Sequence, residues 1–333
     1  MALMAAGALG ILGKTSLVPN TTHALAEGLL VVFSKPVSVS LQGTPFSQSA
    51  VFSEGQAVVL SGGEVGRSDS VAINYTPEDA VLIGFRWSST PEAIGRRLPI
   101  HVLHVSAVME NEVARAVAAA EADSFVTVEQ VSLTAFNGGA PSDLTAYDVI
   151  VFGFNDGYEP GTADAFNLDR LASVRECVRA GAGCVWTHDS LEWDHDLGAV
   201  AEEPAGVDYD KDAYASGRIS AIGGSSVIFG DESHPMLTFP FRISLPSGEG
   251  GLPVDSTHTT GGKTTGATVV ARFAGQRLSH SNFYLTASQF GLGRVAIDEI
   301  GHSYTPWNAG TSSWPSIEEC QLFVDCLLWA AGM

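Results

Sequence analysis

The sequence predicts an α/β protein: a doubly wound, mostly parallel sheet of the flavodoxin type, preceded by a small all-β, sandwich-like domain. Short segments of alternating apolar and polar residues fill residues 28–98, whereas compact apolar runs alternate with helical periodicity from residue 99 onward. The length of 333 residues also fits about two folding units of roughly 150 residues each. We therefore divide the chain into an apolar N-terminal arm (1–27), a β-module (28–98) and an α/β domain (99–333).

The β-module is predicted from period-two alternation, which is clearest at 37–41 and 71–75. Gly62-Gly63 and the segment 77–79 supply turns between the strands. The predicted strands cover residues 29–33, 37–41, 57–60, 70–75 and 80–87.

The α/β domain is predicted from four apolar strands with helices between them. The link 131–148 carries no convincing helix, and 190–224 reads as an acidic loop. Pro315 opens a closing helix, since proline suits the first helical turn. The predicted strands cover 100–105, 125–131, 148–154 and 184–187, with later ones at 226–229, 268–273, 283–288 and 294–298, and two further helices lie near 113–120 and 168–178.

The composition argues against a disordered chain, a nucleic-acid-binding protein and a membrane-spanning protein. Hydrophobic residues make up 45% of the chain, so it is not disordered for want of apolar side chains. There are 17 Lys and Arg against 37 Asp and Glu, and the formal charge of −20 repels a phosphate backbone, so nucleic acid is not expected as a partner. No apolar run reaches the length of about 20 residues that a membrane-spanning helix needs.

The N-terminal arm is apolar over residues 1–13. We expect it to dock on its own body or on a neighbouring copy of the chain, making a homo-oligomer; a frayed tail or a targeting segment ending near 24–26 are the alternatives. The four cysteines lie in apolar stretches at spacings unlike those of zinc or redox motifs, and we expect them to be buried and inert: Cys177, Cys184, Cys320 and Cys326.

Candidate site residues follow from one rule: ligands of open α/β sheets bind beyond the carboxyl ends of the strands. Loop residues are often polar without binding anything, so each candidate could also be an ordinary loop residue. His188 could act as a general base or metal ligand, or be a histidine satisfied by the backbone. The candidates at strand ends are Ser106, Asn155, Asp156, His188, Asp189, Ser190, Gly301 and His302.

An acidic segment offers the one metal hypothesis. Asp208, Asp210 and Asp212 begin like a calcium loop, but Ala213 and Ile219 stand where an EF-hand needs its Gly and its Glu, so we reject an EF-hand. Either a divalent cation binds these carboxylates or the segment is a solvated loop, and no other cofactor is expected.

The C-terminal motifs resemble those of ThuA-like proteins, which belong to the class I glutamine amidotransferase-like superfamily. The segments that carry the resemblance are 147–152, 180–188, 234–235, 291–297, 301–303 and 328–332, within about 99–333. The resemblance implies site roles for His188, His234 and His302 and a sugar-related activity. It does not imply glutamine hydrolysis, because Thr187-His188-Asp189 stands where amidotransferases carry a Cys elbow. Ser106 and 239–241 also depart from the family's pattern.

From these observations we expect a non-catalytic or degenerate amidotransferase-like domain that serves as a structural or binding subunit of a homo-oligomer, in a virion or other extracellular particle. The alternative is a ThuA-like enzyme acting on a carbohydrate or related small molecule. In that case His188 is the base or a metal ligand, His302 and Asp156 orient the substrate, and Ser106, Asn155, Asp189 and His234 bind it.

Overall fold

The structure is a computed structural model, and the chain divides into two compact units that we describe separately. One unit holds residues 1–98 with 238–242 and 333, and the other holds 99–237 and 243–332. The structure describes six strands between residues 14 and 88, followed by 99–107, 111–154, 166–188, 190–191, 197–209, 222–243, 245, 250–259, 262–276, 282–301 and 315–333.

The first unit contains two three-stranded antiparallel sheets, ordered β1-β5-β3 and β4-β2-β6. Five of the strands overlap predicted ones, and β1 was not predicted. The sandwich arrangement of the two sheets stays a prediction, and residues 1–13 of the arm lie outside the described residues. The strands are β1 (Lys14–Leu17), β2 (Leu25–Phe33), β3 (Ser38–Gln42), β4 (Ala57–Gly66), β5 (Val71–Thr76) and β6 (Leu82–Ser88).

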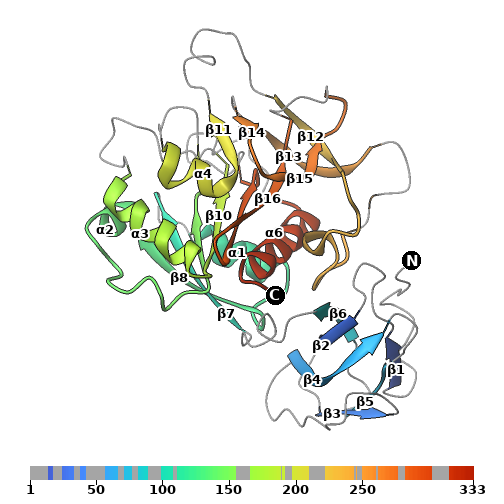
Figure 1. Cartoon of the computed structure of the whole chain (residues 1–333). Helices are drawn as coiled ribbons and strands as arrows, with labels where there is room; N and C mark the ends of the chain where they lie inside the picture. The colour runs from blue at the N-terminus through green and yellow to red at the C-terminus, as the bar shows by residue number, and fades with distance from the viewer. Residues whose placement is uncertain are drawn as a thin grey trace. The chain divides into compact units, whose positions relative to one another are not determined.

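The second unit is built on a nine-stranded sheet in the order β13-β12-β15-β16-β17-β10-β9-β7-β8. The strands from β8 to β17 are parallel, and those from β17 to β13 are antiparallel (Figure 1). The flavodoxin-like α/β prediction is therefore confirmed, but "mostly parallel" was wrong, because half of the neighbouring strand pairs are antiparallel. The strands are β7 (Ile100–Ser106), β8 (Val126–Ser132), β9 (Val149–Phe152), β10 (Gly183–Thr187), β12 (Ile222–Phe229), β13 (Leu252–Thr259), β15 (Thr268–Phe273), β16 (Leu285–Phe290) and β17 (Gly293–Asp298).

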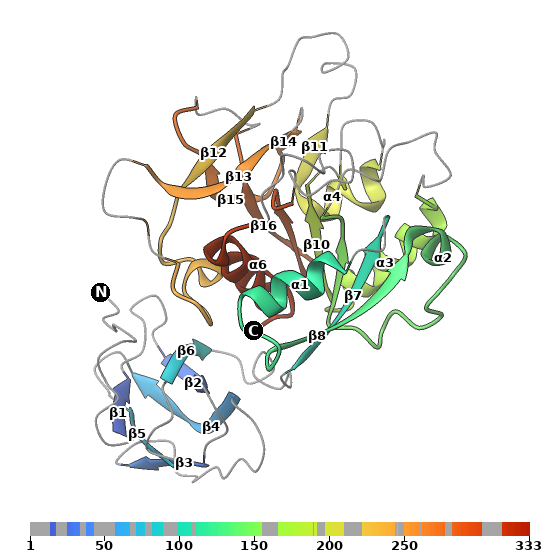
Figure 2. The same ribbon diagram turned by 180° about the vertical axis from the view of Figure 1, so that it is seen from behind.

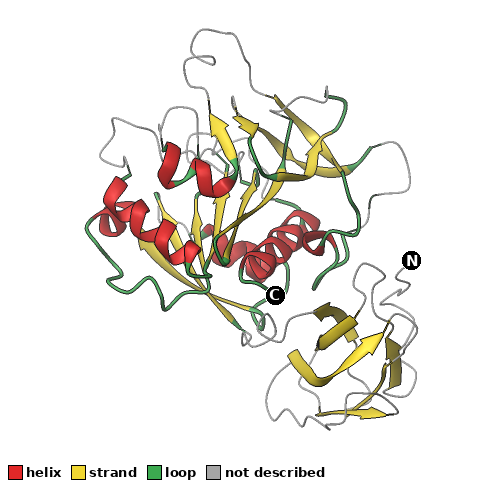
Figure 3. Cartoon of the chain, in the orientation of Figure 1, coloured by secondary structure: helices red, strands yellow, loops and turns green. Residues whose placement is uncertain are grey.

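Helices cover both faces of this sheet, as Figures 2 and 3 show. Helices α1 and α6 pack together on one face, whereas α3 and α4 pack on the other. A short helix, α2, lies in the link 131–148, and the predicted loop 190–224 contains α4 and two further short elements. The bounds are α1 (Glu112–Ala119), α2 (Leu133–Asn137), α3 (Leu168–Arg179), α4 (Glu202–Ala205), α6 (Ile317–Ala330), the 3₁₀ turns η2 (Gly198–Val200) and η3 (Pro235–Leu237), and a small sheet of β11 (Val207–Tyr209) and β14 (Gly262–Thr264). No helix in the described ranges is both long and apolar enough for a bilayer crossing.

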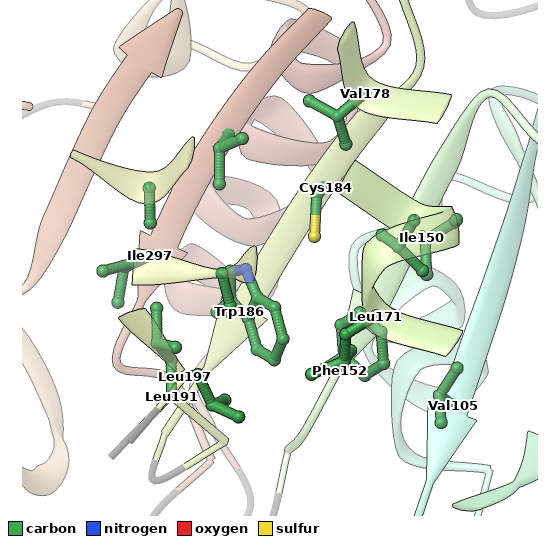
Figure 4. Packing of buried hydrophobic residues seen from close by; sticks show 14 of the residues in the cluster. Val105, Ile150, Phe152, Leu171, Val178, Cys184, Trp186, Leu191, Leu197 and Ile297 are labelled. Carbon is green, nitrogen blue, oxygen red and sulfur yellow. The ribbon is translucent and has the colours of Figure 1, made fainter. Parts of the chain in front are cut away.

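The core under α3 explains why the central strands are so apolar. Every residue of β9 and β10 is buried, and the Phe152 ring stacks on Trp186 with centroids 4.3 Å apart. Figure 4 shows this layer, with Cys184 and Leu171 beside the two rings. Burying one such side chain stabilises the fold by about 1.5–3 kcal/mol, so this layer holds the parallel strands rigidly. Three of the four cysteines are buried, and all four are free thiols.

The direction of α6 shows which edge of the sheet holds the carboxyl ends of the parallel strands and which holds their amino ends. The end of α6 lies over the start of β10, because a Cβ built on Gly183 would sit 2.5 Å from Ala330 O. The first turn of α6 lies instead near the end of β17, where the Tyr284 hydroxyl donates to Glu319 at 3.4 Å. Helix α6 therefore runs antiparallel to β10 and β17, from the carboxyl edge of the parallel strands to their amino edge.

Candidate functional site

The carboxyl edge of the parallel strands is where the fold would place a ligand. The order β8-β7-β9-β10-β17 corresponds to the flavodoxin order 2-1-3-4-5, so the crossovers diverge between β7 and β9. Four strand ends reach this edge: Ser106 at the end of β7, Gly153 after β9, His188 after β10 and Asp298 at the end of β17.

His188 is held by two groups on its Nδ1 atom. Glu299 Oε2 lies 3.3 Å and Thr257 Oγ1 lies 3.2 Å from it. The Thr257 hydroxyl donates its proton to Glu299 O at 2.8 Å, so its oxygen accepts from the imidazole. Both groups on Nδ1 are thus acceptors, which places a proton on Nδ1 and the basic lone pair of the neutral ring on Nε2.

The same histidine is enclosed by β13, a strand from the far end of the sheet. His188 is 0% exposed, Glu299 3% and Thr257 4%, and the His258 ring meets His188 edge-on at 4.8 Å. In a flat sheet, five strand spacings of about 4.8 Å would put β13 about 24 Å from β10. The antiparallel half must therefore coil strongly, bringing β13 over the carboxyl edge.

The ends of β9 and β10 are tied to each other by hydroxyl groups. Thr187 Oγ1 donates to Phe152 O at 3.2 Å and accepts from the Phe154 N–H. Ser190 Oγ lies 3.1 Å from Phe152 O and 2.6 Å from Thr187 O. Gly153 has φ +111°, and a Cβ there would sit 2.2 Å from Thr187 Oγ1. The side chains of Thr187 and Ser190 thus bond to the backbone at the end of the neighbouring strand β9.

Buried polar groups also fill the space between β7 and β9. His104 Nε2 lies 3.1 Å from Gly153 O and 4.0 Å from the Glu112 carboxylate, and Gln130 Nε2 lies 3.4 Å from His104 Nδ1. Nε2 therefore donates to the carbonyl while Nδ1 accepts from the amide. Burial lowers the pKa of His104 to about 4, so the ring is neutral at physiological pH. Ser106, predicted as a ligand-binding residue, is 0% exposed.

His234 is not brought to this edge. Its ring lies 5.9 Å from that of Trp329, and Trp329 O accepts from Arg294 at 2.8 Å. Arg294 pairs with Gly183 at the amino end of β10, whereas Asp298 pairs with Thr187 at the carboxyl end. Ten helical residues separate Glu319 from Trp329, a rise of about 15 Å. His188 and His234 therefore lie toward opposite edges of the sheet, and the binding role expected for His234 stays a prediction.

The remaining predicted site residues divide into two groups. Asp208 is half-exposed and forms an ion pair with Lys263, with Nζ and Oδ2 2.7 Å apart. Within the described ranges, no three His, Cys, Asp or Glu side chains are grouped to hold a metal ion, so the divalent cation stays a prediction. The structure does not describe Asn155, Asp156, Asp189, Asp210, Asp212 or His302.

Sequence reasoning missed the residues that hold His188. Glu299 directly follows β17, so the rule that selected His188 could have selected it as well. Thr257 and His258 had no such signal, because β13 reads as a polar segment interrupted by Pro253.

No family model and no curated protein matches the sequence. Solved structures that resemble the chain include a cytoplasmic protein from Salmonella typhimurium, with a TM-score of 0.44 and 14% identity over 70% of this chain and 99% of that one. A ThuA-like protein from Bacteroides uniformis has a TM-score of 0.39 and 12% identity over 69% and 90% of the two chains. A GMP synthase component from Thermoplasma acidophilum has a TM-score of 0.39 and 10% identity over 71% and 96%. These identities concern the fold alone, so membership of the ThuA-like family and its residue roles stay predictions.

Proposed function

We propose that residues 99–333 form a non-catalytic amidotransferase-like domain and that the chain is a structural or binding subunit of a homo-oligomer. The observation that carries this proposal is the burial of the carboxyl edge. Ser106, Thr187, His188 and Ser190 are each no more than 2% exposed. A catalytic edge of this fold needs side chains that a substrate can reach, whereas these lie beneath neighbouring elements.

The hydrogen bonds of the same residues support a structural role. The hydroxyls of Thr187 and Ser190 bond to the carbonyl of Phe152, and His104 bonds to that of Gly153. A nucleophilic hydroxyl needs a general base as its partner, and a backbone carbonyl cannot serve as one. These contacts hold neighbouring strand ends together, which is a structural role.

The thiol chemistry of glutamine hydrolysis has no candidate in the described ranges near the elbow. Cys184 lies within β10, three residues before Thr187, and is 2% exposed. Burial raises the pKa of this thiol well above its ordinary value, so it is not a thiolate at neutral pH.

The test of the proposal measures mass and activity on the full chain. Multi-angle light scattering should give at least twice the chain mass of 34.9 kDa. Deletion of residues 1–12 should reduce the number of chains per particle. Glutamine and a panel of nitrophenyl glycosides should show no turnover above that of a His188→Ala chain. If the full-length chain is monomeric, or if the deletion leaves the number of chains per particle unchanged, the proposal of an oligomer held together by the N-terminal arm is contradicted. Turnover that His188→Ala abolishes contradicts the non-catalytic role.

The second candidate is an enzyme acting on a carbohydrate or related small molecule, and one observation favours it. The Glu299 carboxylate and the Thr257 hydroxyl fix the His188 tautomer with Nε2 as the basic nitrogen, as a general base requires. In this case Glu299→Gln should lower the turnover number while leaving KM unchanged. His101→Gln, a change at an exposed residue of β7, should alter neither and serves as the matched control.

A further inference from the structure

Three elements meet on the α6 face where β17 ends, and they bring carboxyl groups together. Asp298 and Glu299 come from the end of β17, and Glu319 and Asp325 come from α6. Each of these four is no more than 3% exposed. Strand β13 packs on the same junction, since Asp255 N–H donates to Glu319 Oε1 at 2.9 Å.

Two of these carboxyl groups accept hydrogen bonds from donors that favour the ionised form. Burial is nevertheless the largest effect on Glu319 and raises the pKa of this carboxyl group above its ordinary value. Glu319 accepts from the backbone N–H of Ser316 and Asp255, both at 2.9 Å, and from the Tyr284 hydroxyl. Glu299 accepts from the His188 imidazole. Hydrogen bonds of this kind stabilise a carboxylate where water cannot reach it.

Asp298 differs from both. Its Oδ1 accepts one hydrogen bond, from Ile300 N–H at 3.3 Å, and its Oδ2 is buried with no partner. Burial is the largest cause of a strongly raised pKa, and the charges of Glu319 and Glu299 raise it further against the opposing effect of the Ile300 N–H. No Lys or Arg in the described ranges is among the charges that shift it. The neutral carboxyl is therefore the form that fits this junction.

We propose that Asp298 is a pH-sensitive latch for the junction of β17, α6 and β13. Neutral, it lets the three elements pack. Ionised, it adds a like charge beside Glu299 and Glu319 and loosens α6 and β13 from the sheet. This inference does not depend on whether His188 is catalytic.

The other titratable groups around the latch come from every packed element. Tyr284 precedes β16, Asp325 and Cys326 lie on α6, Asp255 and His258 lie on β13, and His188 follows β10. Burial raises the pKa of both Tyr284 and Cys326, so these two stay neutral and supply no compensating charge.

The direction of the pH effect follows from the raised pKa of Asp298. A carboxyl group whose pKa is higher in the folded than in the unfolded chain contributes stability that is fully present below the unfolded value of about 3.9. That contribution is lost as the pH rises through the folded value. Loosening of β13 also removes Thr257 from His188, so the buried edge opens toward alkaline pH and closes toward acid.

Hydrogen exchange followed by mass spectrometry tests the latch on the full chain. Between pH 5 and pH 8.5, after correction for intrinsic exchange rates, protection of 252–259 and 317–326 should fall relative to 149–152. In Asp298→Asn, whose side chain is isosteric but cannot ionise, protection of both segments should stay flat and exceed wild type at least tenfold at pH 8.5. The matched control Asp208→Asn removes a half-exposed carboxyl group paired with Lys263 and should retain the wild-type pH dependence.

Two results for the Asp298→Asn variant would overturn the latch. One is an Asp298→Asn chain with the pH dependence of wild type. The other is an Asp298→Asn chain that is unfolded or unprotected even at pH 5, because that would mean that the junction needs the ionised carboxylate. Infrared spectroscopy of the wild-type chain gives an independent readout that needs no folded variant. A protonated-carboxyl band should persist at pH 7, and its absence refutes the proposal.

Discussion

His104 should make the α/β unit lose stability in acid. The ring is buried between β7 and β9 and has a pKa of about 4, against an ordinary value of about 6.5. Between these values the unfolded chain binds a proton that the folded chain does not, so the free energy of unfolding falls as the pH falls. The difference in pKa corresponds to about 3 kcal/mol, fully lost once the pH is below about 4.

Substitution of His104 by Gln isolates this effect. The variant should lose some stability at pH 7.5, where the ring hydrogen bonds are intact, but it should lack the histidine's acid-induced loss. Urea unfolding followed by circular dichroism from pH 7.5 to 4 should show the variant gaining about 3 kcal/mol on wild type across that range. The opposite effect of Asp298 is present in both chains and cancels in the difference.

The control is His101→Gln, three residues earlier on the same strand and exposed. The free energy of unfolding of this control, plotted against pH, should run parallel to that of wild type. If the His104→Gln curve also runs parallel to wild type, the ring is not a buried neutral histidine and the reasoning from burial to pKa is refuted.

Three further predictions concern stability and reactivity. Ser316→Ala removes the capping box of α6 and should lower the free energy of unfolding by about 1 kcal/mol, measured as a lower urea midpoint. Phe152→Ala removes a ring stacked on Trp186 and should cost about 3–5 kcal/mol, whereas Leu292→Ala, at a residue 79% exposed, should change stability by less than about 0.5 kcal/mol. Iodoacetamide at pH 8 should alkylate Cys177 slowly, because burial raises its pKa, and should reach the other three cysteines only in denaturant; mass spectrometry showing a second native adduct would contradict their burial.

The parallel half of the sheet could be predicted because its strands are buried on both faces. Strands β9 and β10 are short runs in which every residue is buried, so apolar composition alone marks them. Strand β13 gives no such signal. Leu252–Thr259 contains Pro253 and a mixture of Ser, Thr, Asp and His, a composition typical of a loop. Only its pairing with β12 makes it a strand.

The candidate site, like the sheet, could be predicted only in part from the sequence. The strand-end rule identifies His188 because it depends only on where an apolar run stops. The same rule applied to β17 gives Asp298 and Glu299, although carboxylates that begin a loop are common and attract no notice. His234 shows the limit of motif order: its spacing in the sequence says nothing about which end of α6 it reaches, and that end proves to be the amino edge of the sheet.

The reach of β13 decides how the two candidate functions should be weighed. A flat sheet would leave β13 about 24 Å from β10 and the carboxyl edge open, as a catalytic pocket of this fold requires. The coiled sheet instead sets Thr257 against His188 and Asp255 against Glu319, so any ligand that reaches Nε2 from this side must first displace β13. A rigid β13 therefore favours the scaffold. If Asp298 releases β13 at alkaline pH, His188 would become accessible only above the pKa of Asp298, and an enzymatic activity that depends on His188 should rise with pH over that range.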